Sequence, residues 1–176
     1  MTRHFVAALL ISIPLAAGAA AQEHSPYAHA GSDLVKTLSR EEVDELLSGA
    51  GMGLARPAEL NGLPGPRHVL ELADSLALSP AQRDAVQAAF DDMEAEAKAL
   101  GQRVIDAEIA LDSLFAGSPP EPEAIRSAVE RVSGLETRLR VVHLLAHLRV
   151  TELLIPHQIH EYARLRGYAE HEHDGP

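Results

Sequence analysis

Histidine is the residue type in this sequence with the greatest capacity for chemistry, because its imidazole is the commonest metal-ligating side chain in proteins. The chain contains 10 histidines among 176 residues and no cysteine, so it has neither a thiolate ligand nor a thiol nucleophile. Six of the histidines fall into three close pairs, and each pair could contribute ligands to a metal ion. These pairs are His143 and His147, His157 and His160, and His171 and His173.

The first pair has the clearest geometry, since residues four apart on a helix lie on one face and can share an ion. The second pair has Glu161 beside it, and the third lies in an acidic tail. Zinc is held tightly only by three or four ligands, so nearby acids, another helix or a second subunit would have to complete a site. The structural alternatives are the edge of an apolar seam for the first pair, a surface or interface for the second and a solvated tail for the third.

No catalytic motif accompanies the histidines. Residues 157–161, His-Gln-Ile-His-Glu, match neither the His-Glu-x-x-His motif of zinc proteases nor its inverse, and no Gly-x-Ser-x-Gly elbow occurs. Residues 49–53, Gly-Ala-Gly-Met-Gly, follow a helical pattern rather than a strand, so they do not fit a phosphate loop. They predict a hinge or a close-packed turn that lets Met52 and Leu54 dock on the helical hairpin described below. We expect a protein that is not an enzyme.

The N-terminus has the pattern of a secretory signal peptide. Arg3 precedes an apolar run at residues 5–17 that is too short to span a bilayer, and three alanines follow at residues 19–21. We therefore expect export with cleavage near Ala21, and no membrane insertion of the mature protein. Residues 22–38 predict a flexible segment.

The charge balance limits the partners. The sequence has 26 acidic and 15 basic residues, a formal net charge of −11, which argues against binding to nucleic acid or to anionic membranes. Aromatic residues make up only 3% of the chain, and tryptophan is absent, so there are few platforms on which bases could stack.

Two long helices must position these side chains. Residues 79–82, Ser-Pro-Ala-Gln, combine a capping serine, a proline suited to the first helical position and a glutamine that can reach back. Apolar or small side chains then recur at spacings of four and three, a period of 3.5 residues that favours packing against a partner helix. They are Val86, Phe90, Met93, Ala97, Leu100, Val104, Ala107, Leu111 and Leu114.

A partner helix follows directly. Residues 117–120, Gly-Ser-Pro-Pro, break the first helix, and residues 121–123, Glu-Pro-Glu, begin the second. So short a connection predicts a long antiparallel helical hairpin as the body of an all-α fold. The second apolar stripe comprises Ile125, Val129, Val132, Leu135, Leu139, Val142 and Leu145 or Ala146.

Shorter helices precede the hairpin. A capping box of Ser39 and Glu42 predicts a short helix that ends at Gly49. Turn-forming residues predict an ordered loop over residues 54–66. Pro66 then begins another short helix, which ends before the first long one.

The C-terminal end contains an interruption. Pro156 lies within an apolar pattern and predicts a kinked or broken C-terminal helix, with a final helix near residues 156–166. The helical domain is therefore expected at residues 39–168. Residues 169–176 are expected to form a disordered tail of histidines and acids.

Two short motifs resemble the paired Leu-Thr-x-x-Gln motifs of the Spy/CpxP family. Residues 78–82 read Leu-Ser-Pro-Ala-Gln and residues 154–158 read Leu-Ile-Pro-His-Gln, so serine and isoleucine replace the threonine. The resemblance covers roughly residues 66–168 and implies a periplasmic, all-α protein in which each motif begins a helix. The motif residues are Leu78, Ser79, Gln82, Leu154, Pro156 and Gln158.

The resemblance implies two functional styles. The first, our leading expectation, is an ATP-independent chaperone that dimerises and binds unfolded exported proteins on an apolar surface ringed by charge. Candidate residues for this client or dimer surface are Leu144, Leu148, Ile159 and Leu165. The alternative is a periplasmic heavy-metal sensor or resistance protein that binds zinc, copper or nickel through the histidines above. A third reading is an adaptor that docks on a membrane sensor kinase.

Overall fold

The computed structural model describes residues 35–168, and this part of the chain has an all-α fold with no strand. The predicted signal peptide, most of the predicted flexible segment and the tail with His171 and His173 lie outside the described residues. The helices, in chain order, are α1 (Arg40–Ser48), α2 (Arg56–Leu60), α3 (Pro66–Glu71), α4 (Pro80–Leu114), α5 (Pro122–Leu153) and α6 (Pro156–Leu165).

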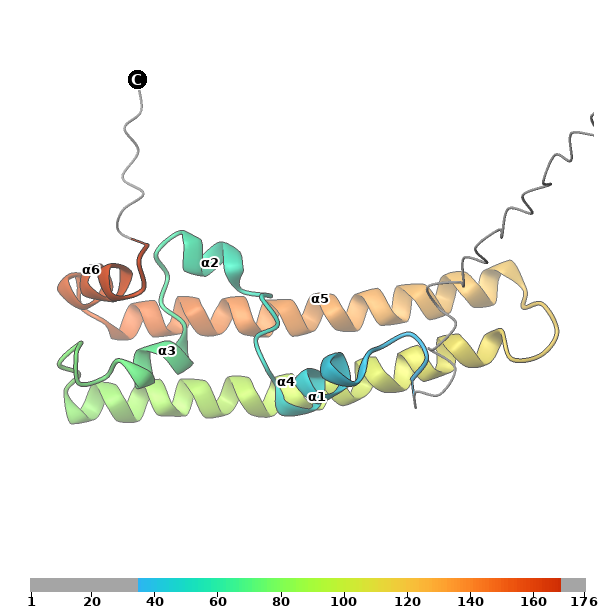
Figure 1. Cartoon of the computed structure of the whole chain (residues 1–176), viewed down its shortest axis with the longest axis horizontal. Coiled ribbons are helices and arrows are strands. Elements are labelled where there is room, and N and C mark those ends of the chain that lie inside the picture. Colours follow the sequence, from blue (N-terminus) through green and yellow to red (C-terminus); the bar gives the residue numbers. More distant parts are fainter. Residues whose placement is uncertain (1–34, 169–176) are drawn as a thin grey trace, which may run out of the picture.

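The predicted hairpin is confirmed: α4 and α5 run antiparallel along each other over almost their whole length (Figure 1). α4 begins where the sequence indicates, because the Ser79 hydroxyl accepts a hydrogen bond from the Gln82 N–H at 3.2 Å. The Gln82 side chain reaches back to the Ser79 N–H at 3.1 Å. Both halves of the capping box are therefore made.

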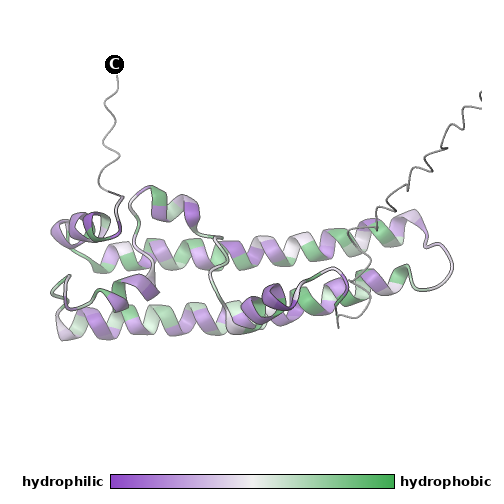
Figure 2. Cartoon of the chain, in the orientation of Figure 1, coloured by the Kyte–Doolittle hydropathy of each residue, from purple (hydrophilic) through white to green (hydrophobic). Residues whose placement is uncertain are grey.

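Most of the predicted apolar stripe is buried in the seam, and apolar and polar residues alternate along both long helices (Figure 2). Val129 of the second stripe differs, because it is exposed. At the last position Ala146 is buried and Leu145 is exposed, so Ala146 is the alternative that belongs to the stripe. Val129 belongs to the first turns of α5. None of the labelled short helices lies over that end of the hairpin (Figure 1). On α4, Ala89 is buried and Phe90 only partly so, because the short helices widen the buried face beyond a single stripe.

Helix α1 is positioned as predicted. Ser39 and Glu42 form the capping box, and Gly49 ends the helix in the left-handed conformation at φ 68°. The helix packs on α4 directly over Gly101, and Leu46 is buried there. The ordered packing begins before residue 39, because Val35 is buried in the same core. The turn after α1 brings Met52 and Leu54 against this core, as expected.

The segment between α1 and α4 differs from the prediction in two ways: it contains one helix that was not expected, and its expected helix is shorter. The expected loop at 54–66 contains α2, a single short helix with Pro57 near its start and no side-chain cap. α3 ends at Glu71, and turns continue the chain to Ser79. These pieces are held by packing rather than by local helix signals, since Ala73 and Leu76 are buried against the hairpin.

The predicted interruption at Pro156 is a break. α5 ends at Leu153, the backbone is extended at Leu154, and α6 begins at Pro156. Gln158 Oε1 accepts a hydrogen bond from the Ile155 N–H at 3.0 Å, which caps the new helix. The isoleucine side chain has no oxygen with which to return the bond, so only half of a capping box is made.

Candidate functional site

A cavity of roughly 560 Å³ lies between the α2–α3 segment and the hairpin. It is within the size range of small-ligand sites, and it is lined from the hairpin side by His143, His147 and Met93. From the other side it is lined by the turn that carries Met52, by the α2–α3 segment, and by Arg166 and Tyr168, which follow α6. The first predicted histidine pair therefore faces a cavity, and it is buried rather than at the edge of the seam.

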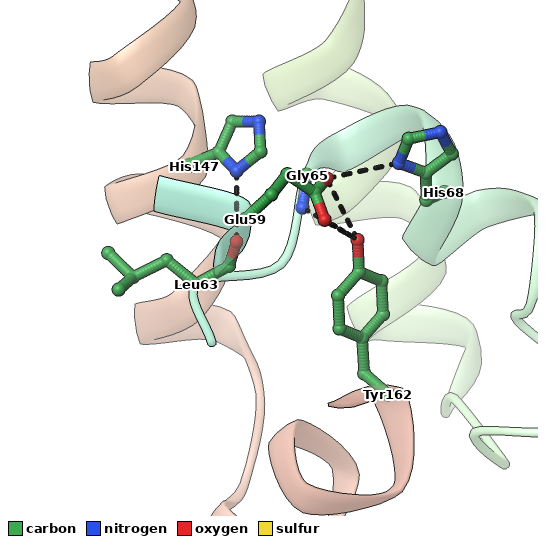
Figure 3. A network of polar contacts seen from close by, with 6 residues as sticks. All are labelled: Glu59, Leu63, Gly65, His68, His147 and Tyr162. Atoms are coloured by element: carbon green, nitrogen blue, oxygen red, sulfur yellow. Dashed lines mark hydrogen bonds and ion pairs between the residues drawn. The ribbon is translucent and has the colours of Figure 1, made fainter. Parts of the chain in front are cut away.

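His147 is held in one orientation. Its side chain is 7% exposed, and its Nδ1 lies 2.9 Å from the carbonyl oxygen of Leu63 (Figure 3). Because a carbonyl oxygen only accepts hydrogen bonds, Nδ1 carries a proton, and in the neutral ring the lone pair is therefore on Nε2. This is the arrangement by which an outer partner orients a metal-ligating imidazole.

His143 lies one helical turn before His147 on α5 and is only 3% exposed. Its Nε2 is buried and has no hydrogen-bond partner within residues 35–168. Burial lowers the pKa of His143, and the neighbouring His147 and Arg67 lower it further. The ring is therefore neutral at neutral pH, with a buried nitrogen that costs about 1–3 kcal/mol while it stays unsatisfied.

Gly65 leaves space beside these groups. A Cβ at this position would lie 2.9 Å from both His147 Nε2 and Glu59 Oε1, closer than such atoms normally approach. Glycine is required here by the close approach of side chains rather than by backbone conformation. The imidazole lone pair of His147 and one carboxylate oxygen of Glu59 thus converge on the same point.

A hydrogen-bond network anchors the segment that covers the cavity. The hydroxyl of Tyr162 donates to Glu59 at 2.9–3.0 Å and accepts from the Gly65 N–H at 3.4 Å, while His68 Nδ1 lies 3.1 Å from Glu59 Oε1 (Figure 3). Tyr162 is fully buried, and that burial, together with the charge of Glu59, raises the pKa of its hydroxyl. The network thus connects α6 to α2 and α3, which belong to the segment that covers His143 and His147.

The other predicted ligands are not brought into this site. His157 and His160 are exposed on α6. Within residues 35–168 there is no group of three or more histidine, cysteine, aspartate or glutamate side chains placed to hold a metal ion. Any site at the first pair must therefore draw on other ligand types.

The four residues predicted for a client or dimer surface do not form one exposed surface. Leu148 is exposed and Leu144 is partly buried, both on α5. Ile159 and Leu165 are partly buried because they pack against the core formed by α3, α6 and the open end of the hairpin.

Sequence reasoning missed several residues of this site, which are Glu59, Leu63, Gly65, Tyr162 and the cavity-facing role of Met52 and Met93. Glu59 and Leu63 lie in a stretch rich in turn residues that gives no sign of what it will contact. Tyr162 lies four residues after Gln158, so the helical repeat places it on the same buried face. That spacing was the one available signal.

The chain belongs to the heavy-metal resistance family, whose family model matches residues 45–160. This family lies in the same helical superfamily as the Spy/CpxP proteins, which confirms the resemblance at that wider level. No curated protein and no solved structure matches the chain significantly. Across residues 35–168, no helix has the length and hydropathy needed to cross a membrane.

Proposed function

We propose that this protein is an exported, periplasmic metal-binding protein of heavy-metal resistance, with His143 and His147 as its primary ligands. The observation that carries the proposal is the buried imidazole pair one turn apart, with His147 oriented by Leu63 and His143 Nε2 without a hydrogen-bond partner among the described residues. Family membership supports it independently, because the matched region includes both histidines.

The electrostatics of the pair suit a ligand role. Only a neutral imidazole has a lone pair to offer, and the lowered pKa of His143 keeps that ring neutral. An ion bound at Nε2 would satisfy the orphaned nitrogen and remove its desolvation cost. The carbonyl of Leu63 holds the second ring in the tautomer that binding needs.

The test is calorimetry of the chain with zinc, copper and nickel. His143→Ala/His147→Ala is expected to weaken binding of the preferred metal by more than about 100-fold, since both oriented ligands are lost. The matched control is His157→Ala/His160→Ala, which removes an exposed pair from α6 and should change affinity less than about twofold. Equal affinities in the two double variants, with both still folded by circular dichroism, would overturn the proposal.

A second proposal, client binding, is supported by a different surface. Val141, Leu145 and Leu148 are 45%, 57% and 48% exposed, and their spacing places them in one row on α5. Val141 and Leu145 also line a groove of about 340 Å³ between α4 and α5, and charged residues such as Asp92 and Arg138 line the same groove. An apolar row of this kind, ringed by charge, suits the capture of exposed apolar segments.

The client-binding proposal predicts that the protein slows aggregation of a denatured exported protein, measured by light scattering at equal concentrations. Leu145→Ser/Leu148→Ser should abolish most of that protection because it interrupts the row. Leu47→Ser, which removes an exposed leucine from α1, is the control and should keep full protection. Equal protection by all three proteins, or none by the unaltered chain, would exclude this role for the row.

A further inference from the structure

We infer that the ion bound at His143 and His147 is a soft monovalent one, copper(I) or silver(I), and that the thioethers of Met52 and Met93 complete its ligand set. The inference rests on the proposed metal-binding function and specifies its ligand. The sequence contains three methionines, and the third is Met1. Both methionines of the described chain therefore line the one cavity that also receives both buried histidines.

The two methionines reach the cavity from different elements. Met93 is 9% exposed on α4, opposite the histidines of α5. Met52 lies between Gly51 and Gly53 in the turn after α1, with a positive φ of 46°. That backbone conformation is costly for a residue other than glycine, and such strain is concentrated at functional sites.

The ligand types in the cavity favour a soft ion. Thioethers and imidazoles suit copper(I), whereas magnesium, calcium and manganese prefer oxygen ligands. Among residues 35–168, Glu59 is the only acidic residue that lines this cavity, and Tyr162 and His68 already bond its oxygens. With no cysteine in the chain, sulfur can come only from methionine.

The charges around the cavity favour a single positive charge. Arg56, Arg67 and Arg166 also line it, so three guanidinium groups face one carboxylate. Arg67 lies over the ring of Phe90, with 5.5 Å from its Cζ to the ring centroid, and makes no ion pair to the described residues. Coulomb repulsion scales with charge, so a divalent ion would experience twice the repulsion of a monovalent one at the same place.

The test compares silver(I), as a redox-stable probe, with zinc(II), by competition titration of the full chain. Met52→Leu/Met93→Leu should weaken silver binding by roughly 30-fold or more and change zinc binding less than about twofold, because the protein ligands of zinc are thiolate, imidazole and carboxylate rather than thioether. Leucine is close to methionine in volume, so the fold should persist. X-ray absorption of the copper(I)-loaded chain should show sulfur scatterers that the double variant lacks.

Leu60→Ala is the matched control, since Leu60 lines the same cavity without offering a ligand. Silver binding that is unchanged in the methionine variant, or weakened equally by Leu60→Ala, would overturn the inference. Zinc binding that depends on the histidines, with no silver binding, would overturn it while leaving the proposed function standing. Failure to bind silver, together with no binding of zinc, copper or nickel in the calorimetry above, would remove both the inference and the proposed function.

Discussion

Gly101→Ala is expected to destabilise the protein by about 2–3 kcal/mol, although it replaces a glycine in the interior of a long helix. Such a change normally stabilises a helix by about 1 kcal/mol. At this position, however, the new Cβ would lie 2.1 Å from the carbonyl oxygen of Leu46 and 2.7 Å from its carbonyl carbon. These are backbone atoms of α1, so relief requires α1 to move off α4 as a unit and Leu46 to lose its burial.

The measurement is chemical denaturation, with Gly134→Ala as the matched control. Gly134 is the helical glycine of α5, and a Cβ there would meet nothing within 4 Å. It should therefore show the ordinary gain of about 0.5–1 kcal/mol. If the two substitutions shift stability in the same direction by similar amounts, α1 does not pack on α4 through Gly101.

The helix ends could be predicted from sequence because their causes are local. Ser39 and Ser79 each cap a helix through contacts three residues away, and Gly49 and Pro156 act on their own backbone. The docking of α1 could not be predicted in the same way. It depends on Gly101 meeting a backbone more than fifty residues earlier in the chain, and an isolated glycine in a helical pattern does not reveal its partner.

The candidate site shows the same division. The four-residue spacing of His143 and His147 placed them on one helix face, but their burial depends on a distant segment that folds over them. Leu63 supplies that cover and is 84 residues from the histidine it orients. No periodicity within α5 distinguishes a histidine at the edge of a seam from one beneath such a cover, so the burial of this pair could not be predicted from the sequence.

The sequence could predict that the glutamine of each motif caps its own helix, but not that the two glutamines contact each other. Each reaches back to cap its own helix, and the two side-chain amides also bond each other, at 2.8 Å and 3.2 Å. Gln82 Nε2 also donates to the backbone carbonyl of Leu153, and Gln158 Nε2 donates to the backbone carbonyl of Leu76. Each glutamine therefore bonds the backbone just before the other motif. The motifs therefore act as one clasp across the open end of the hairpin.

Gln158→Leu should therefore cost about 3 kcal/mol in the free energy of unfolding, because it leaves several polar groups unpaired at once. Gln158 is buried, and its loss removes the partner of the Ile155 N–H, the Leu76 carbonyl and the Gln82 amide. Leucine fills similar space, so the cost is mainly electrostatic rather than a packing defect. Urea denaturation followed by circular dichroism measures it directly.

A double-mutant cycle separates the clasp from two independent caps. If the amides act together, Gln82→Leu and Gln158→Leu combined should cost at least about 1 kcal/mol less than the sum of the single changes. Gln87→Leu is the control, because within residues 35–168 the side chain of that exposed glutamine of α4 bonds only Asp91, one turn away. It should shift stability by less than about 0.5 kcal/mol. Strict additivity of the two motif substitutions would show that each glutamine serves only its own helix, and the open end of the hairpin would then be held by apolar packing alone.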